Sequence, residues 1–230
     1  MIDTGYLFSN EPDRLFVNTS LGCTANCEYC YLPTLNYSKG KALDTYITAE
    51  ELIKQVESYK GYKSGKNGTL ISFGCYSECW DETNKPQTIK LIDYFLKKGN
   101  QVQFSTKRFV DYRDLIEIGN NIKYYGQLTI FVSSATISAW DKFEKGTTEP
   151  SQRFKSFEIT KELNIPVILY IKPVLLDITI KDINKYIEVI KKYNIKEVVV
   201  GSIIKTNGTG EVAPFVKDNS MHTQPIEQEK

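Results

Sequence analysis

Residues 22–33 read GCTANCEYCYLP and hold three of the five cysteines of a 230-residue chain. These are Cys23, Cys27 and Cys30, in the spacing C-x3-C-x2-C. Soft thiolates select zinc or iron–sulfur clusters, and a structural zinc site usually takes four protein ligands. Three thiols in one loop can instead hold three irons of a cubane [4Fe–4S] cluster, which leaves the fourth iron open. The alternatives are such a cluster, or a zinc site completed by Cys75 or Cys79.

The composition around this loop is that of an ordinary globular chain. It is 41% apolar, with 29 basic and 28 acidic residues, so the bulk charge indicates neither a nucleic acid nor an anionic membrane as partner. The first residues lack the apolar run of a signal peptide, and no stretch reaches the roughly 18 apolar residues of a membrane span. We therefore expect a cytoplasmic protein without membrane contact. Thiols stay reduced there and serve metal binding or chemistry.

Apolar runs and helical patterns alternate along the rest of the chain. The predicted strands are residues 14–20, 68–74, 101–106, 127–134, 165–173 and 196–204, and the predicted helices are residues 49–60, 87–99, 110–119, 151–164 and 182–194. This alternation predicts a parallel sheet with helical crossovers. Because the strands are apolar runs, we expect both faces of the sheet to be covered. An open doubly wound sheet and a partial six-stranded barrel both fit.

The predicted domain organisation is simple. We expect one core domain over residues 1–204, which includes a short N-terminal extension over residues 1–13. Residues 205–230 are polar, with scattered glycine and proline, and predict a partly disordered tail.

Reactive side chains follow the carboxyl ends of the predicted strands, which is where ligands bind in parallel α/β folds. The cysteine loop follows the first strand. After the later strands come, in order, Cys75, Ser77 and Glu78; Lys107; Ser133 and Arg153; and Lys172. This common position predicts one active site at one rim.

A C-x3-C-x2-C motif with an aromatic residue before its last cysteine, directly after the first strand, resembles that of the radical S-adenosylmethionine (SAM) superfamily. The resemblance implies a partial (β/α)6 TIM-like barrel with parallel strands inside and helices outside. It implies an enzyme, of lyase or oxidoreductase type, that binds SAM on the open iron of a [4Fe–4S] cluster. An electron donor such as flavodoxin or ferredoxin would drive reductive cleavage to a 5′-deoxyadenosyl radical, which abstracts hydrogen from a substrate.

Within the superfamily, residues 14–204 look most like spore photoproduct lyase and its relatives. The matching segments are CEYCYL (27–32), GCYSE (74–78), STKR (105–108) and FEKGTTEPSQR (143–153). The resemblance makes Cys75 a hydrogen-atom donor and Tyr31 its relay. It makes cofactor contacts of Tyr29, Ser77, Glu78, Lys107, Ser133 and Arg153. For Arg153, a helix cap or an ion pair with Glu144 is the alternative.

Several departures from these relatives bear on the substrate. The Gly-Gly-Glu stretch common in the superfamily is absent, and no second cysteine group follows that could hold an auxiliary cluster. The lyase's C-terminal DNA-binding hairpin has no counterpart. Our hypothesis is a nucleobase or nucleotide substrate, with a peptide as the alternative. A zinc-stabilised binding module is the alternative from another class. The wide opening of a six-stranded barrel also predicts a large substrate or a partner protein that closes the site.

Overall fold

The six predicted strands lie side by side in one sheet, in sequence order. The structure is a computed structural model and describes residues 2–41, 47–201, 205–206 and 211–212. The six are β3 (Arg14–Val17), β5 (Leu70–Phe73), β6 (Val102–Thr106), β7 (Leu128–Ser133), β9 (Val167–Ile171) and β10 (Val198–Val200), and every neighbouring pair is parallel. The sheet ends at β10 without closing. The partial barrel is confirmed.

The N-terminal extension adds two strands that the sequence analysis did not predict. β1 (Ile2–Asp3) and β2 (Leu7–Glu11) pair antiparallel onto β3 and bring the sheet to eight strands. Pro12 and Asp13, both strong turn formers, separate β2 from β3. The Ser9 hydroxyl bonds the carbonyls of Glu11 and Arg14 across this turn. The count of six strands was therefore wrong for the sheet, although it holds for the parallel part.

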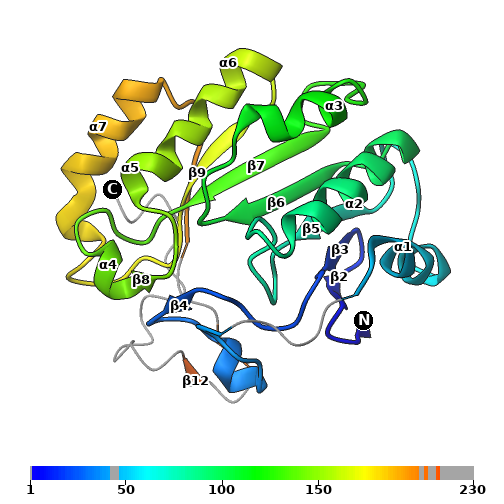
Figure 1. Cartoon of the computed structure of the whole chain (residues 1–230), viewed down its shortest axis with the longest axis horizontal. Helices are drawn as coiled ribbons and strands as arrows, with labels where there is room; N and C mark the ends of the chain where they lie inside the picture. Colours follow the sequence, from blue (N-terminus) through cyan, green and yellow to red (C-terminus); the bar gives the residue numbers. More distant parts are fainter. Residues whose placement is uncertain (1, 42–46, 202–204, 207–210, 213–230) are drawn as a thin grey trace.

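Three predicted helices form almost as expected, and they lie on one side of the sheet in Figure 1. They are α1 (Ala49–Ser58), α2 (Lys85–Lys98) and α7 (Ile183–Tyr193). Thr48 and Glu51 form a reciprocal capping box at the start of α1. Gly99 ends α2 with φ +89°, a left-handed conformation that favours glycine. Local caps thus explain why the ends of these helices are readable from sequence.

The other two predicted helices are broken into shorter turns. Residues 110–119 contain η2 (Tyr112–Leu115) and α3 (Ile116–Gly119). Residues 151–164 contain most of α5 (Pro150–Arg153), η3 (Phe154–Glu158) and α6 (Ile159–Leu163). The 3-10 turn of η3 buries Phe154 and Phe157 in the core, and Ser156 in it accepts a hydrogen bond from the backbone N–H of Val110. Tertiary packing has overridden the helical pattern here.

The two faces of the sheet differ in burial. Strand residues such as Leu15, Phe104 and Ile130 belong to one buried core with the helices. Alternate residues, such as Phe16 and Gln103, point to the opposite face and remain partly exposed. The expectation that both faces are covered was therefore wrong for the described residues, because the helices pack on only one of them.

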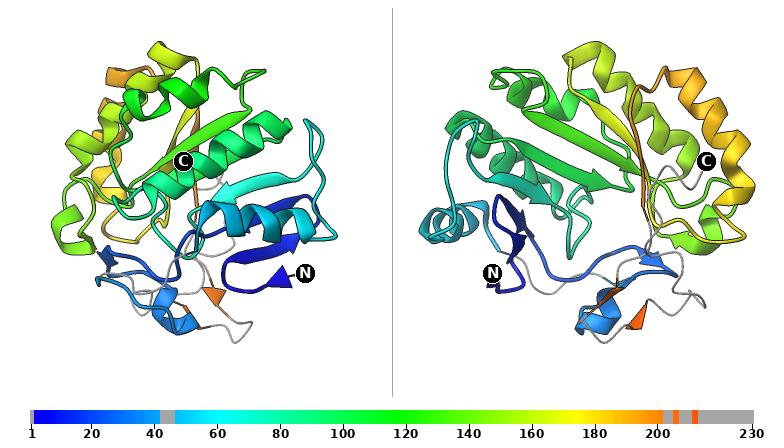
Figure 2. Two further views of the ribbon diagram at one scale, coloured as in Figure 1. Left: turned by 45° about the vertical axis from the view of Figure 1, so that its right-hand side comes forward. Right: turned by 180° about the vertical axis from the view of Figure 1, so that it is seen from behind.

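Short elements border the carboxyl ends of the strands: β4 (Asn26–Cys27), η1 (Leu32–Leu35), α4 (Trp140–Phe143), β8 (Glu144–Lys145) and η4 (Ile180–Asp182). β4 pairs with β8 beneath the sheet (Figures 1 and 2). In the predicted tail, β11 (Lys205–Thr206) pairs with β12 (Glu211–Val212). The predicted disorder lies outside the described residues, and the domain boundary at residue 204 stays a prediction. Within the described part of the chain, no helix has the length and apolar character needed to cross a bilayer.

Candidate active site

The cysteine loop is fixed to the rim by backbone hydrogen bonds from several directions. Gly22 donates to the carbonyl of Tyr76 (3.0 Å), beyond the end of β5. Gly40 donates to the carbonyls of Cys23 and Ala25, both at 2.9 Å. In β4, Cys27 lies opposite Glu144 of β8. The three cysteines therefore sit on a loop whose backbone the surrounding structure already holds.

The three thiols share one small apolar group with Ala25, Ala135 and Leu175. Burial raises the pKa of the Cys27 thiol to about 12, and it raises the pKa of Cys23 and Cys30 above the usual value. A cationic metal centre would be needed to hold them as thiolates at neutral pH. Among the described residues, no three His, Cys, Asp or Glu side chains are close enough to hold a single ion. Three cysteine thiols in one loop are a donor set that fits an iron–sulfur cluster, whose irons are held by thiolates.

The candidate fourth zinc ligands make other contacts. The side chain of Cys79 is 1% exposed and belongs to the main core, with its Sγ 3.6 Å from the carbonyl of Ser105. Cys75 faces Tyr31 instead. Trp80, next to Cys79, is also buried and stacks on Phe104, with ring centroids 4.6 Å apart. These contacts give the zinc alternative no support.

A buried ionic network lies beside the cysteine loop, centred on Glu144. One of its carboxylate oxygens accepts from the Tyr29 hydroxyl and from the backbone N–H of Ala135 (3.0 Å). Its other oxygen pairs with Nη1 of Arg153 at 2.9 Å, and Lys107 Nζ lies 3.8 Å from Oε1. Burial alone would raise the pKa of Glu144, but the charges of Arg153 and Lys107 and the Tyr29 hydrogen bond hold it below its ordinary value. The carboxylate is therefore ionised at neutral pH.

The sequence predicted Glu144 only as the alternative partner of Arg153 within FEKGTTEPSQR, with no role of its own beside the cysteine loop. A usable signal was present, since an acid that falls in a buried position next to a basic site residue needs a partner. The pairing of β8 with β4, which brings Glu144 to the cysteine loop, could not be read from the sequence.

The Arg153 side chain is fully buried, and its five N–H groups contact acceptors within the protein. Besides Glu144, its guanidinium donates to the carbonyls of Ser133 (2.5 Å) and Thr148 and to the Thr147 hydroxyl. A direct cofactor contact by Arg153 stays a prediction, but no donor is left free for it. The geometry makes Arg153 a residue that orients Glu144 and the end of β7.

Lys107 and Ser133 meet at the rim. Lys107 Nζ donates to Ser133 Oγ at 2.6 Å and lies 5.7 Å from the ring centroid of Tyr29. Its side chain is 17% exposed. This places a positive charge at the edge of the cysteine group, where it can meet an anionic ligand group.

Ser77 and Glu78 occupy the turn after β5. Glu78 is tied down: its carboxylate accepts from the Thr106 hydroxyl (2.5 Å) and from the backbone N–H of Trp80 and Lys107. The Ser77 hydroxyl, by contrast, is buried and has no partner among the described residues. An unpaired buried hydroxyl is costly, so Ser77 is the better placed of the two to meet a bound cofactor.

Tyr31 and Cys75 contact each other across the mouth of the barrel. The Tyr31 hydroxyl donates to the backbone carbonyl of Cys75, and its oxygen is 3.9 Å from Cys75 Sγ. Burial raises the pKa of Cys75 to about 11, although the hydrogen bond from Tyr31 opposes this. Cys75 is therefore a neutral thiol at physiological pH. Tyr29 points the other way, to Glu144.

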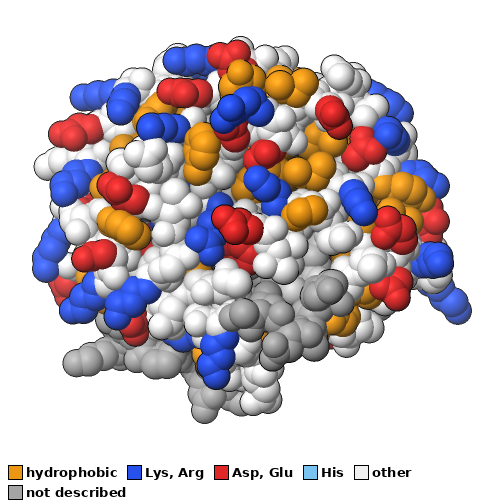
Figure 3. Space-filling model, in the orientation of Figure 1, with side chains coloured by type: hydrophobic (Ala, Val, Ile, Leu, Met, Phe, Trp, Pro, Cys, Tyr) orange, Lys and Arg blue, Asp and Glu red, His pale blue; other side chains and the backbone are white. Residues whose placement is uncertain are grey.

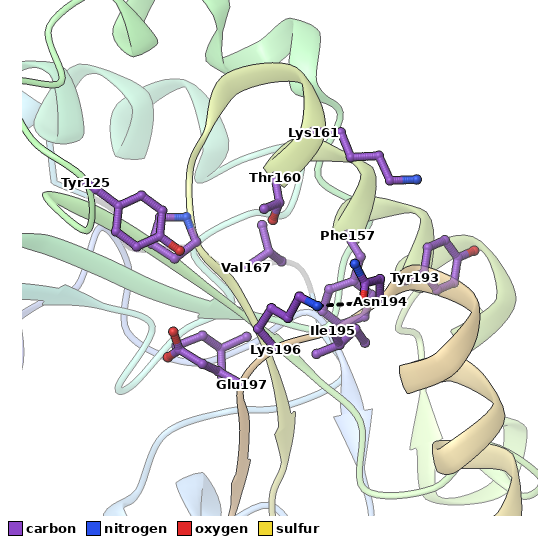
Figure 4. A pocket seen from close by; sticks show the side chains of 12 residues that line it. Tyr125, Phe157, Thr160, Lys161, Val167, Tyr193, Asn194, Ile195, Lys196 and Glu197 are labelled. Atoms are coloured by element: carbon purple, nitrogen blue, oxygen red, sulfur yellow. Dashed lines mark hydrogen bonds between the residues drawn. The ribbon is translucent and has the colours of Figure 1, made fainter.

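A pocket at the opposite end of the strands is unrelated to these residues. Figure 4 shows its lining, which includes Thr160, Val167, Tyr193, Ile195 and Glu197. Val167 begins β9, and Glu197 directly precedes β10. The amino ends of the strands therefore border this pocket, whereas every candidate site residue lies at the carboxyl ends.

Comparisons with known proteins bear on the family and the fold of the chain. The family profile described as the radical SAM superfamily matches residues 17–201. The comparison with curated proteins gives no match. Among solved structures, SuiB of Streptococcus suis bound to S-adenosylmethionine is 15% identical, with a TM-score of 0.61, over 87% of this chain and 43% of SuiB. SuiB bound to its precursor peptide SuiA is also 15% identical, with a TM-score of 0.62, over 87% of this chain and 42% of SuiB.

A mutant spore photoproduct lyase with bound AdoMet and dinucleoside spore photoproduct is also 15% identical to the chain. Its TM-score is 0.54, over 78% of this chain and 51% of the lyase. At such identity these likenesses show a shared fold. The chain spans about half or less of the length of these proteins.

Proposed function

The chain belongs to the radical SAM superfamily, and from that premise we propose that it cleaves SAM reductively and uses the resulting radical to abstract hydrogen from a substrate. The superfamily implies SAM and an iron–sulfur cluster; the [4Fe–4S] type is part of the proposal. When bound, the two would supply a 5′-deoxyadenosyl radical at the rim. The observation that carries the proposal is the buried apolar group that Cys23, Cys27 and Cys30 share beside the Glu144 network.

The chain's own residues have distinct tasks in this proposal. Cys23, Cys27 and Cys30 hold the cluster, and Ala135 and Leu175 exclude water around it. Lys107 and Ser133 receive the carboxylate of SAM, because Lys107 brings a positive charge that acts on the cysteine group and already contacts Ser133. Ser77 offers its unpaired hydroxyl. Tyr29, Glu78 and Arg153 orient these groups through the contacts described above. A fixed geometry of the binding groups favours the reaction.

Cys75 returns a hydrogen atom to the substrate radical. Its S–H bond breaks as a substrate C–H bond forms, and the sulfur radical left behind takes the hydroxyl hydrogen of Tyr31, whose oxygen is 3.9 Å away. The tyrosine is restored by one electron from an external donor of the flavodoxin or ferredoxin class and by one proton. The neutral state of the thiol supports this role, because only the protonated form has a hydrogen atom to give.

The substrate is proposed to be a nucleobase or nucleotide. A peptide is the second candidate, because the SuiB fold, which resembles this chain, has been solved with a precursor peptide. The electron donor, flavodoxin or ferredoxin, and a partner protein that closes the open barrel are further parts of the proposal.

A SAM cleavage assay tests the proposal directly. The protein is reconstituted anaerobically with iron and sulfide and reduced with dithionite, and 5′-deoxyadenosine is quantified by chromatography. We expect product from the wild type and from Cys79→Ala, and none from Cys27→Ser. If the wild type contains a full iron–sulfur complement and yields no 5′-deoxyadenosine, the proposed enzymatic activity is refuted. Stoichiometric zinc with no iron uptake would favour the zinc-stabilised module.

A further inference from the structure

The inner face of the sheet, opposite the helices, is built in rows that the strand register defines. Paired residues project side chains to the same face. One row runs Phe16, Ser72, Gln103 and Thr129. The next contains Ser105, Phe131 and Ile168, and the row nearest the rim contains Ser133, Tyr170 and Val199. Aromatic and hydroxyl side chains therefore share a surface that leads up to the candidate site.

This surface remains partly open. Phe16, Gln103, Ser105, Phe131 and Tyr170 are all partly exposed, whereas their strand neighbours on the other face are buried in the core. The interior of a closed TIM barrel is filled by layers of side chains. Half-exposed aromatic rings inside an open barrel instead offer flat apolar contact area to a ligand.

Two cations stand on this face without a strong anionic partner. Arg14 donates from Nε to Ser72 Oγ at 2.9 Å, and its guanidinium lies 4.4 Å from the ring centroid of Phe16. Its nearest carboxylate, on exposed Glu11, is 3.9 Å away. Lys172 Nζ lies 5.7 Å from the ring centroid of Tyr170 and has no carboxylate partner among the described residues. Two under-compensated charges on one half-exposed surface favour an anion.

Both cations act on Cys75. The positive charges of Arg14 and Lys172 each oppose the effect of burial on the pKa of that thiol, and Asp3 acts in the opposite sense. Such an effect requires the charges to lie within electrostatic reach of Sγ. This agrees with the register, which puts Arg14 two residues before Phe16 on the inner face, and with the contact of Lys172 with the Tyr170 ring on the same face.

We propose that the inner face binds an anionic substrate with a planar ring, of the nucleotide class, whose phosphate lies between Arg14 and Lys172 and whose ring packs on Phe131 and Tyr170. This inference rests on the proposed function and narrows its substrate. A phosphate group can contact two separated cations better than a single carboxylate group can. Gln103, Ser105 and Thr129 offer hydrogen-bonding groups for the edge of a base. A peptide that binds by strand addition would need an unpaired strand edge, and this face presents side chains instead.

Equilibrium binding tests the inference. The reconstituted protein, with SAM present, is titrated by calorimetry with the four deoxynucleoside monophosphates and with the matching nucleosides. We expect at least one monophosphate to bind tenfold or more tightly than its nucleoside. Arg14→Met and Lys172→Met should each weaken binding of that monophosphate about tenfold without changing the affinity for its nucleoside. Lys172→Arg keeps the positive charge and should bind the monophosphate as the wild type does. Phe131→Ala should weaken both ligands by similar factors, because base stacking on an aromatic ring is independent of the phosphate.

Matched controls come from charges on the helical side. Lys192→Met on α7 and Arg113→Met, whose guanidinium pairs with Asp111, should leave nucleotide binding unchanged. The inference fails if no monophosphate binds, if nucleosides bind equally well, or if Arg14→Met and Lys172→Met behave like these controls. Binding of an acidic tyrosine peptide in place of every nucleotide would also overturn it. SAM cleavage by the wild type without added substrate reports on the proposed function separately.

Discussion

Glu144 has no exposed surface and lies between two cations, Arg153 and Lys107. Removing one partner of a buried ion pair leaves an uncompensated charge and costs about 3–5 kcal/mol. We therefore expect Glu144→Ala to lower the free energy of unfolding by about that amount, measured by urea denaturation. Glu144→Gln should cost less, because its amide oxygen can still accept from Tyr29 and Ala135. Equal, small effects of both variants would contradict the buried pair.

The same carboxylate makes stability depend on pH. Its folded pKa lies below the ordinary 4.5, so its contribution is complete above pH 4.5 and is lost as the pH falls through the folded pKa. Between pH 5 and 3, the wild type should therefore lose more stability than Glu144→Gln. Glu117→Gln, at an exposed position, serves as the control and should follow the wild type. Parallel curves for wild type and Glu144→Gln would show that Glu144 is not the group responsible.

Cys75 should react as a thiol of raised pKa. Alkylation by iodoacetamide requires the thiolate, and the pKa of Cys75 is about 11. Site-resolved mass spectrometry of the apo protein should therefore show a labelling rate that still rises tenfold per pH unit between pH 8 and 10. Lys172→Met should slow labelling further, because it removes a charge that favours the thiolate. A rate that levels off below pH 9 would contradict this environment.

At the residue scale, the sequence predicted which residues lie at the rim better than it predicted the contacts that these residues make. Residue type and loop position were sufficient to place Cys75, Lys107 and Ser133 on one rim. The ion pair of Arg153 with Glu144, nine residues away, was one of the roles predicted for Arg153. The contact of Glu144 with Tyr29 depends instead on the β4–β8 pairing between segments over a hundred residues apart. No local pattern carries that information.

Gly74 connects β5 to the turn that carries Cys75 and Ser77. Its φ is +90°, and a Cβ there would lie 2.9 Å from the Ser105 carbonyl oxygen. Gly126 has φ +80° but open space around a Cβ. Alanine in a left-handed conformation costs about 1–2 kcal/mol, so Gly126→Ala should lose that amount. Gly74→Ala should lose about 1–3 kcal/mol more, from the backbone clash. Thermal and urea unfolding of the two variants measure the difference, and equal losses would contradict the close approach.

Elements with local signals were the predictable ones. Thr48 and Glu51 mark the start of α1, and Gly99 marks the end of α2. β1 and β2 escaped prediction because they are short and partly polar, and they exist by pairing onto β3. The broken helix over 151–164 was missed because packing of Phe154 and Phe157, rather than helix propensity, sets its geometry.

At the scale of the whole molecule, the six-stranded parallel core followed from the βα alternation, but the openness of its inner face did not. Apolar runs are typical of strands covered on both sides. Here β6 and β7 alternate, with Gln103, Ser105, Thr129 and Phe131 partly exposed between buried neighbours. A sheet that stops at β10 cannot enclose that face, so residues that read as core become a surface for ligands.

Cluster loading should act on one part of the fold and leave the rest unchanged. A ligand that binds only the folded protein stabilises the residues that its site orders. Residues 18–40 hold the three cysteines, and they join residues 143–145 through β4–β8 and through the Glu28 N–H to Phe143 carbonyl bond. Hydrogen exchange on the reconstituted protein should therefore slow by tenfold or more in these two segments. Exchange in β6 and β7, in the centre of the sheet, should not change. The variant with Cys23, Cys27 and Cys30 all replaced by serine should show no slowing after the same treatment. If the wild type takes up zinc in place of iron, and exchange also slows in the segment around Cys79, the result would instead indicate a zinc site.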